Sequence, residues 1–502
     1  MRKSNKKLPS GLDYKENLGS ILNPKTVAVI GASKNFGKWG QLILSNIIAG
    51  GFQGKVFPLN PRDDEIFGLK VYKRIGDVPE PVDLVFITTP ASIVHDVLDD
   101  CGRHGVKGAV IVTSGFSEQD YSGKKLEKEI VKLCVQNKLA IIGPNTMGII
   151  CPYSHLFATG THTRPRKGSV AFISQSGNLG NQLIHWAEQQ GIGISLFVGS
   201  GNEAMLSCND YLEYLEKDPH TGIIVLYLES VENGPEFIET AKRINARKPI
   251  IVLKGGRTDA GRAAAASHTG SMSGENAIFR AACRQAGILD VRVPTELLDL
   301  SAAFSSLPLP RGNKVGIVTL GGGWGVVTAD ECNERGLQVP ELPREIVERI
   351  GKHLPPFWSR GNPVDLVGTT NREAPIVAVE ELLKWEGIDA VICLGIVGRN
   401  EMVRQLLQST KEVDPEASLD ALSAIEELSA EFEEGFVMKM AELMETYAKP
   451  VIGVSLARTE QGTVRYLPGK KYNGVFYQTP ENAVNALARM VEYSQFKHNI
   501  DM

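Results

Sequence analysis

Between residues 26 and 150, short apolar and β-branched runs alternate with stretches that have the periodicity of amphipathic helices. Each run ends in Gly, Pro, Ser or Asn, as buried strands of a parallel sheet do where they pass into loops. The alternation indicates a doubly wound α/β domain over 21–150, with ligands bound at the carboxyl ends of its strands. The predicted strands are TVAVIGAS, KVFPLNP, DLVFITTP, GAVIVTSG and LAIIGPN.

The same pattern restarts twice further along the chain. Residues 151–168 are irregular and are expected to cross to a second α/β domain over 151–306, with strands in SVAFISQSG, ISLFVGSGN, GIIVLYLES and PIIVLKGG. A Pro-rich linker, 307–313, precedes a third α/β domain over 314–502. An acidic stretch within that domain, 420–436, predicts a solvated amphipathic helix.

Composition and charge are those of a soluble multidomain protein of 502 residues. The net charge of −4 gives no reason to expect binding to nucleic acid, and no apolar run is long enough to span a membrane. Residues 1–20 begin with MRKSNKK and lack an apolar segment, so we expect a disordered tail and not a signal peptide. The seven cysteines form no CxxC pair, which favours a reducing cytoplasm over disulfides or a zinc site.

The first predicted strand runs into a Gly-rich turn, VAVIGASKNFGKWG. Such a turn presents backbone N–H groups to a phosphate at a helix N-terminus. A P-loop is excluded, because five residues separate Gly31 from Gly37 and Trp39 follows Lys38. An NAD site is disfavoured, because the second strand ends in Asn60 without a carboxylate for the ribose. The alternative is a tight turn that binds nothing.

A second turn of this kind, SQSGNLG, follows the strand VAFI and precedes a helix. The hydroxyls of Ser174 and Ser176 and the N–H groups of Gly177 and Asn178 are suited to a phosphoryl group at the start of that helix. A serine hydrolase is disfavoured, because the G-x-S-x-G elbow needs a glycine where Ser174 stands. A plain serine N-cap is the alternative.

His268 lies in GRAAAASHTGS, among the smallest side chains. Phosphoryl transfer to an imidazole needs an exposed nitrogen and a loop with room for a bulky group, and we interpret the stretch as such a loop. The N–H groups of Thr269 and Gly270 would bind the phosphoryl oxygens. Glu229, at the end of the apolar strand IIVLYL, is placed to orient an imidazole. Taken alone, His268 can also be explained as a loop histidine without a function, and Glu229 as a charge at a solvent-exposed strand end.

Together the motifs resemble the NDP-forming acyl-CoA synthetases, the superfamily of ADP-forming acetate–CoA ligase and succinyl-CoA synthetase. VAVIGAS, LNP, GPNTMG, SQSGN, YLES, ASHTGS and GNPVDL occur in the family's order and cover nearly the whole chain after residue 20. The resemblance implies a Rossmann-like CoA-binding domain followed by two flavodoxin-like domains of the succinyl-CoA synthetase type. One departure is Thr146, where the family often has cysteine.

The resemblance also implies roles for individual residues. His268 matches the phosphorylated histidine of the family, and Glu229 matches the carboxylate that steadies it. The thiol of CoA would point toward Asn145. The phosphoryl group would be bound by Ser174, Gln175, Ser176, Gly177, Asn178, Thr269 and Gly270. The rest of CoA would lie against Gly31, Ala32, Ser33, Gly37, Lys38, Asn60, Arg62, Thr89 and Pro90.

The implied reaction converts acyl-CoA, phosphate and ADP into a carboxylic acid, CoA and ATP, through an acyl phosphate and phosphohistidine. The family's ATP-grasp module has no counterpart in the sequence, so a separate ATP-grasp β-type subunit is expected to hold ADP or ATP with Mg²⁺ in a heterotetramer. The acid would be a short-chain or aryl carboxylic acid. The alternatives are a non-catalytic CoA-binding protein and an NAD-dependent oxidoreductase.

Overall fold

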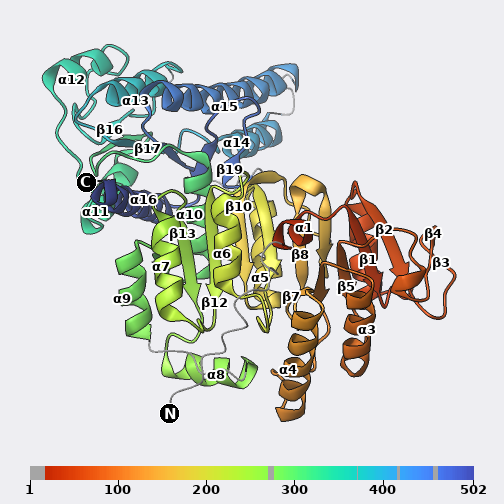
Figure 1. The fold of residues 1–502 in the computed structure, drawn as a ribbon. Coiled ribbons are helices and arrows are strands. Elements are labelled where there is room, and N and C mark those ends of the chain that lie inside the picture. The colour runs from red at the N-terminus through yellow and green to blue at the C-terminus, as the bar shows by residue number, and fades with distance from the viewer. Residues whose placement is uncertain (1–16, 270–275, 370, 415–418, 456–461, 502) are drawn as a thin grey trace. The chain divides into compact units, whose positions relative to one another are not determined.

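The computed structural model describes residues 17–501 except 270–275, 370, 415–418 and 456–461, and it contains two compact units (Figure 1). Unit 1 extends to Glu188 and resumes at Gly193–Pro294. Unit 2 contains Gln189–Ile192 and the chain from Thr295 onward. The first two domains expected from the sequence therefore lie in one unit.

The first sheet of unit 1 has five parallel strands in the order β2-β1-β5-β6-β7. Its strands are almost entirely apolar, because helices cover both faces of a parallel sheet. The chain leaves β1 toward β2 on one side and returns to β5 on the other, so the strand order reverses at β1. The strands are β1 (Thr26–Ile30), β2 (Lys55–Leu59), β5 (Leu84–Ile87), β6 (Gly108–Ile111) and β7 (Ala140–Ile142), beside a small hairpin, β3 (Glu65–Ile66) and β4 (Leu69–Lys70).

The second sheet of unit 1 has seven strands in the order β14-β13-β12-β10-β11-β8-β9. Its order reverses at β10, which lies between β11 and β12. The segment predicted to be an irregular crossover instead contributes a hairpin, whose strand β8 pairs antiparallel with β11. The strands are β8 (Gly148–Cys151), β9 (Leu156–Thr159), β10 (Lys167–Ser174), β11 (Ile194–Gly199), β12 (Ile223–Leu228), β13 (Ile250–Lys254) and β14 (Leu289–Val291).

The helices of unit 1 connect successive strands and cover the sheets. Helix α1 begins at Leu18, so residues 18–20 are ordered and the predicted disordered tail is too long by these residues; 1–16 lie outside the described part of the chain. Figure 1 shows α6 and α7 side by side on the second sheet. The helices are α1 (Leu18–Leu22), α2 (Trp39–Ala49), α3 (Ala91–Arg103), α4 (Tyr121–Gln136), α5 (Gly177–Gln189), α6 (Cys208–Lys217), α7 (Gly234–Asn245), α8 (Asp259–Thr269) and α9 (Asn276–Ala286), with 3-10 turns η1 (Ile75–Asp77) and η2 (Pro152–Ser154).

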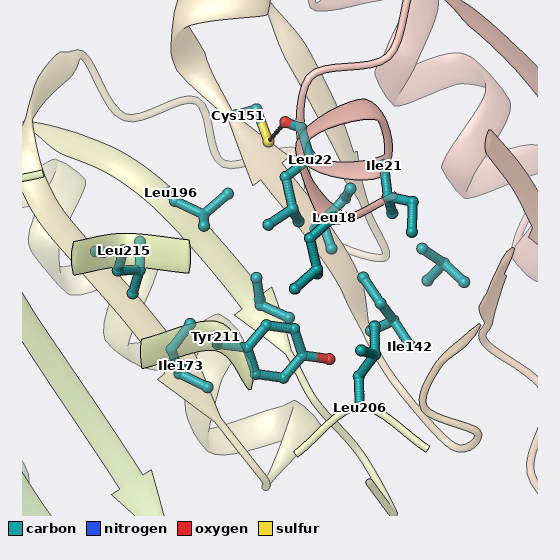
Figure 2. Close-up of a cluster of buried hydrophobic side chains, with 14 of the residues drawn as sticks. Leu18, Ile21, Leu22, Ile142, Cys151, Ile173, Leu196, Leu206, Tyr211 and Leu215 are labelled. Atoms are coloured by element: carbon teal, nitrogen blue, oxygen red, sulfur yellow. Dashed lines mark hydrogen bonds between the residues drawn. The ribbon is translucent and has the colours of Figure 1, made fainter. Parts of the chain in front are cut away.

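One hydrophobic cluster joins the two sheets of unit 1. Figure 2 shows Leu18 and Leu22 of α1 among side chains from both sheets, including Ile142 and Ile173. The thiol of Cys151 donates a hydrogen bond to the carbonyl oxygen of Leu22 at 2.8 Å, which fixes α1 on the hairpin. A shared core of this kind resists movement of one sheet against the other, because close-packed interiors transmit displacement.

Unit 2 contains a six-stranded sheet in the order β16-β15-β17-β18-β20-β19, parallel except for β19. Helix α10, predicted to close the second domain, belongs to this unit, where the hydroxyl of Tyr477 donates to the carbonyl oxygen of Asp299 at 2.6 Å. Its elements are β15 (Val315–Thr319), β16 (Val364–Asp365), β17 (Ala390–Leu394), β18 (Val451–Val454), β19 (Val464–Arg465), β20 (Gly474–Tyr477), α10 (Pro294–Ser306), α11 (Gly322–Glu334), α12 (Arg344–Gly351), α13 (Ala374–Lys384), α14 (Asn400–Val413), α15 (Leu419–Tyr447) and α16 (Pro480–Asp501).

The acidic stretch 420–436 lies in a helix, as predicted, but the helix is longer. Helix α15 has 29 residues, and its later half is buried through Phe436, Met440 and Met444. Only its earlier part has the exposed acidic character expected of a solvated helix. Across the described ranges, no helix has the length and apolar character needed to cross a membrane.

Helix α2 starts directly against the Gly-rich turn, and this contact gives a first prediction. A Cβ on Gly40 would overlap the carbonyl oxygen of Gly31. Gly40→Ala should therefore lower the free energy of unfolding of unit 1 by about 2–3 kcal/mol, measured by urea denaturation. Gly19→Ala is the matched control, because a Cβ at Gly19 meets nothing within 4 Å. Equal stabilities of Gly40→Ala and the parent would contradict the close approach.

Candidate functional site

The Gly-rich turn lies at the carboxyl edge of the first sheet, where the strand order reverses and α/β proteins bind ligands. Gly31 has φ +89° and Gly37 has φ +80°, a backbone conformation that favours glycine. A Cβ on Gly31 would lie 2.7 Å from Oγ1 of Thr88, because β5 runs beside β1. The two glycines therefore fix the turn and keep its backbone close to the end of β5.

Several residues predicted to contact CoA converge on this turn. Asn60 donates from Nδ2 to the carbonyl oxygen of Ala32 at 2.7 Å, and the N–H of Arg62 donates to Oδ1 of Asn60 at 2.8 Å. Ser33 accepts at Oγ the N–H of Asn35 at 3.0 Å. Pro90 is the N-cap residue of α3, and Lys38 is the exposed N-cap residue of α2.

Thr89 provides an independent sign that this edge binds a polar molecule. Its Oγ1 is buried without a hydrogen-bond partner in the structure. Such a group loses free energy unless a ligand or water pairs with it. The residues at this edge thus fit a phosphate-rich ligand such as CoA: two left-handed glycines, an N-terminal helix end and an unpaired hydroxyl.

Asn145 follows the last strand of the first sheet and is connected to Thr89. Its backbone is left-handed, with φ +58°, and its N–H donates to the carbonyl oxygen of Thr113 at 3.0 Å. Oγ1 of Thr113 donates in turn to the carbonyl oxygen of Thr89 at 2.6 Å. Thr146, which replaces the family's cysteine, is buried and donates to the carbonyl oxygen of Gly199, so its role here is structural.

The SQSG turn lies where the order of the second sheet reverses, after β10. Ser174 is buried and its Oγ donates to the carbonyl oxygen of Ser176 at 2.7 Å. Helix α5 begins at Gly177, so the N–H groups of Gly177 and Asn178 have no acceptor within the helix. These groups and the positive end of the helix dipole are suited to bind an anion.

Glu229 lies beside this turn, because β12 is the neighbour of β10. Oε1 of Gln175 accepts the N–H of Glu229 at 2.6 Å and that of Ser230 at 3.0 Å. The hydroxyl of Tyr227 donates to Oε1 of Glu229 at 3.3 Å, whereas Oε2 is buried and has no partner among the side chains that the structure describes. The residue is only 8% exposed. A buried carboxylate oxygen in this state has room for one donor, such as an imidazole N–H.

A buried lysine, Lys254, contacts the backbone of Glu229. Lys254 donates from Nζ to the carbonyl oxygens of Glu229 and Gly255, each at 2.6 Å. Burial lowers the pKa of Lys254, and the charge of Glu229 acts in the opposite direction. The ammonium group of Lys254 adds positive charge next to the backbone of Glu229. The sequence pattern alone did not indicate this contact.

The stretch around His268 differs from its prediction. Residues 259–269 form helix α8, not a loop. The reason is local: Ala263 to Ala266 are the strongest helix formers, and Asp259 lies in the first turn where an acidic residue is favourable. For residues 265–269, which include His268 and Thr269, the structure describes only the backbone, and Gly270 lies outside the described residues.

A network of polar side chains that sequence reasoning missed joins Asn202, which follows β11 of the second sheet, to residues of the first domain. Asn202 donates from Nδ2 to Glu118 at 2.6 Å and to Glu127 at 3.0 Å, and its Oδ1 accepts from Asn145 at 3.3 Å. Burial raises the pKa of Glu118, but hydrogen bonds from Asn202 and the N–H of Gly115 outweigh it and hold that pKa below its usual value. The signal available in the sequence was the polar SGNE segment directly after the strand ISLFVG.

Glu203 belongs to the same segment. Its backbone is left-handed, with φ +50°, and its Oε1 accepts from Oγ of Ser200 at 2.8 Å. Burial raises the pKa of the Glu203 carboxyl to about 7, although hydrogen bonds from Ser200 and Gln175 act to lower it. A partly buried carboxyl that is half protonated near neutral pH thus lies next to the SQSG turn.

All seven cysteines are buried and free. Within the described ranges, no three His, Cys, Asp or Glu side chains are arranged to hold a metal ion. The groups that the described site presents are backbone N–H groups, hydroxyls, amides and buried charges.

Comparison with known proteins assigns all three parts of the chain. Three family profiles match successive segments: a CoA binding domain over 25–152, a succinyl-CoA ligase like flavodoxin domain over 167–304 and a Ligase-CoA domain over 315–399. These matches confirm the predicted α/β fold class, a Rossmann-like domain followed by two flavodoxin-like domains.

Individual relatives are similar over most of the chain. The acetate–CoA ligase (ADP-forming) II subunit alpha of Pyrococcus furiosus is 38% identical over 452 residues, 88% of this chain and 95% of that protein. The acetate–CoA ligase (ADP-forming) of Methanocaldococcus jannaschii is 42% identical, and this chain spans only 51% of its length. A solved structure of Ca. Korarchaeum cryptofilum dinucleotide forming acetyl-coenzyme A synthetase 1, with phosphate and ADP, has 34% identity and a TM-score of 0.81, covering 96% of this chain and 98% of that one.

The raised pKa of Glu203 predicts the direction in which the stability of the protein changes with pH. The folded state holds the proton more tightly than the unfolded state, so stability from this group is present below about pH 4.5 and declines as the pH rises to about 7. Glu203→Gln has no ionisable group at this position and does not lose this stability. The difference between its urea midpoint and that of the parent should therefore be more positive at pH 8 than at pH 5.

The exposed Glu239 of α7 supplies the matched control, Glu239→Gln. The pH-dependent difference should be confined to Glu203→Gln. If both variants differ from the parent by the same amount at pH 5 and pH 8, the Glu203 carboxyl is not desolvated as described.

Proposed function

Because the chain belongs to the family of ADP-forming acyl-CoA ligases, we propose that it is the α-type subunit of a ligase that interconverts acyl-CoA, phosphate and ADP with a carboxylic acid, CoA and ATP. The observation that carries this proposal is the unpartnered Oε2 of Glu229. It lies at the strand-order reversal of the second sheet, beside a helix N-terminus suited to an anion.

CoA would bind along the first sheet. Its phosphates would lie against the turn from Gly31 to Lys38, and Thr89 would pair its free hydroxyl with the ligand. The thiol would then reach Asn145, which the hydrogen bonds through Thr113 hold at a fixed place relative to Thr89. The thioester would thus be delivered toward the SQSG turn, because Asn202 connects Asn145 to that side of unit 1.

The first two chemical steps would take place at the SQSG turn. A phosphate oxygen attacks the thioester carbonyl, the C–S bond breaks, and CoA leaves as a thiolate that takes up a proton. A nitrogen of His268 then attacks the phosphorus of the acyl phosphate, and the P–O bond to the carboxylate breaks. The N–H groups of Gly177 and Asn178 would stabilise the transferring phosphoryl group in both steps.

Glu229 would orient the imidazole during the second step. Its Oε2, which has no partner among the described residues, would accept the N–H of the non-reacting nitrogen, fix the tautomer and stabilise the charge that develops on the ring. Without an imidazole, this buried oxygen has no partner among the described residues, and leaving it unpaired costs free energy. A protein that merely sensed CoA would gain nothing from that arrangement, which is why we prefer a ligase over a non-catalytic CoA-binding protein.

The last step would require a second subunit. The phosphohistidine would pass its phosphoryl group to ADP on an ATP-grasp β-type partner, where Mg²⁺ accompanies the nucleotide. Support for a partner comes from coverage: this chain spans nearly all of a relative named as an alpha subunit but about half of a relative without that designation. We propose a heterotetramer in the cytoplasm and a short-chain or aryl carboxylic acid as the substrate.

The nucleophile can be tested directly. His268→Asn keeps a polar side chain but removes the nucleophilic nitrogen, so ligase activity in the presence of an ATP-grasp partner should fall by about 10³-fold or more. The Kd for CoA should change by less than about twofold, since the CoA turn is on another part of unit 1. Both quantities can be measured by thiol release and by calorimetry. Turnover at the parent rate would contradict the phosphohistidine mechanism.

The role of Glu229 predicts a separate effect. Glu229→Gln retains the shape of the side chain but weakens the stabilisation of the charged imidazole, so phosphoryl transfer should slow by about 10²-fold. The exposed Glu236 of α7 gives the control variant Glu236→Gln, which should transfer at the parent rate. Rapid-quench measurement of phosphohistidine formation separates this step from CoA release. An unchanged rate in Glu229→Gln would reduce Glu229 to a strand-end charge.

A further inference from the structure

The side chain of Met147 lies across the start of the helix that forms the candidate phosphoryl site. The nearest atoms to a Cβ built on Gly177 would all belong to Met147, with Sδ at 3.4 Å and Cγ closer still. Gly177 is the first residue of α5. Any other residue at position 177 would displace the methionine, so the glycine creates the space that the thioether occupies.

Trp39 continues the same apolar surface. A Cβ built on Gly160 would lie 2.7 Å from Cη2 of Trp39 and 3.4 Å from Cε of Met147. The indole and the methionine methyl therefore both border the space above a second glycine, Gly160. Trp39 is the first residue of α2 and directly follows the Gly-rich turn, so this surface reaches from the candidate CoA turn to the candidate phosphoryl site. We call Trp39 and Met147 the apolar wall.

The backbone that carries Met147 is held firmly. Thr146 donates to the carbonyl oxygen of Gly199, and the N–H of Gly148 donates to Oγ1 of Thr146 at 3.0 Å. Two residues before Met147, Asn145 is fixed by its bond to Thr113. The wall is therefore part of a rigid segment, and its position relative to Asn145 and Gly177 is set by hydrogen bonds on both sides.

Neither member of the wall is fully buried. Trp39 is 38% exposed, and Met147 is partly buried, unlike the fully enclosed apolar side chains of the strands beside it. An apolar side chain used only for the core would be covered by other protein groups. The wall thus has surface left to contact a bound molecule.

We infer that Met147, backed by Trp39, forms the side of the acyl pocket and determines the size of the acyl group. The inference rests on the proposed function: if the thiol lies at Asn145 and the phosphoryl group at Gly177, then the acyl group lies between them, against the side chain of Met147. The wall offers dispersion contacts and no positive charge, so it suits an uncharged, unbranched short-chain monocarboxylic acyl group. It offers nothing to pair with the second carboxylate of a dicarboxylic acid.

The test is the affinity of the full chain for a series of acyl-CoAs, measured by calorimetry without nucleotide, phosphate or partner. The probes are CoA, acetyl-CoA, butyryl-CoA, hexanoyl-CoA and succinyl-CoA. The parent chain should bind acetyl-CoA or butyryl-CoA more tightly than hexanoyl-CoA. Met147→Ala removes the thioether, so the ratio of hexanoyl to acetyl affinity should rise by about tenfold, while the Kd for CoA itself stays within about twofold.

Two further variants separate pocket shape from folding. Met147→Leu preserves most of the side-chain volume and should retain the preference of the parent chain. Met438→Ala truncates a partly exposed methionine of α15 in unit 2 and should leave all ratios unchanged.

The outcomes distinguish this inference from the proposed function. If Met147→Ala weakens CoA and every acyl-CoA equally, or leaves the ratios as in the parent, Met147 does not line the acyl pocket and the inference is overturned, while the proposed function stands. Tighter binding of succinyl-CoA than of butyryl-CoA by the parent would overturn the substrate class. If the parent binds no CoA at all, the proposed function fails, and this inference fails with it.

Discussion

The amide of Gln175 fixes the spacing between the ends of β10 and β12, and the candidate site depends on that spacing. Its Oε1 accepts two successive N–H groups, those of Glu229 and Ser230, and its Nε2 donates to the carbonyl oxygen of Ser230 at 3.0 Å. Three hydrogen bonds of one partly buried amide determine where Glu229 stands relative to the helix that begins at Gly177. Each is costly to leave unmade, so the turn and the carboxylate are positioned as one group.

The two strand-order reversals of unit 1 extend this constraint to the first sheet. One reversal, at β1, creates the edge where Gly31 and Thr89 meet, and the other, at β10, creates the edge where Gln175 and Glu229 meet. The hydrophobic cluster shared by the two sheets and the contacts of Asn202 with both sides keep these edges at a fixed separation. A ligase that passes an acyl group from a thioester to phosphate needs that fixed separation, since misplacement by about 1 Å costs up to about 10²-fold in rate.

Sequence patterns predicted the strands well because buried parallel strands are continuous apolar runs, as in LVFI of β5, and predicted the Gly-rich turn because its backbone angles favour glycine. The predictions failed where the local preference of a segment, or its pairing with a distant part of the chain, decides the structure. The alanines around His268 were interpreted as space for a loop, although alanine favours helix. The hairpin β8–β9 was interpreted as irregular, because its pairing with β11 is decided by the second sheet and not by its own residues.

The contacts within the candidate site could not be predicted from the sequence, for a related reason. Met147 faces Gly177, and Asn202 contacts Glu118, only because the chain returns to the same place 30 positions further on in the first case and 84 in the second. No periodicity or motif specifies such a pair. The sequence also does not show that Oε2 of Glu229 lacks a partner among the described residues, because that depends on which side chains the fold brings close to it. Resemblance to a family implied the roles, and the buried Oε2 of Glu229 supports the role proposed for that residue.

The most direct test of the account is phosphorylation of His268. The purified chain would be incubated with a short acyl-CoA, phosphate and Mg²⁺, without nucleotide, and examined by mass spectrometry under non-acidic conditions. The account predicts an acid-labile phosphoryl group on His268 that forms as CoA is released and disappears when ADP and an ATP-grasp partner are added. Absence of that group with acetyl-CoA, butyryl-CoA and an aryl-CoA, both with and without the partner, would contradict the account and favour a protein that binds CoA without catalysis.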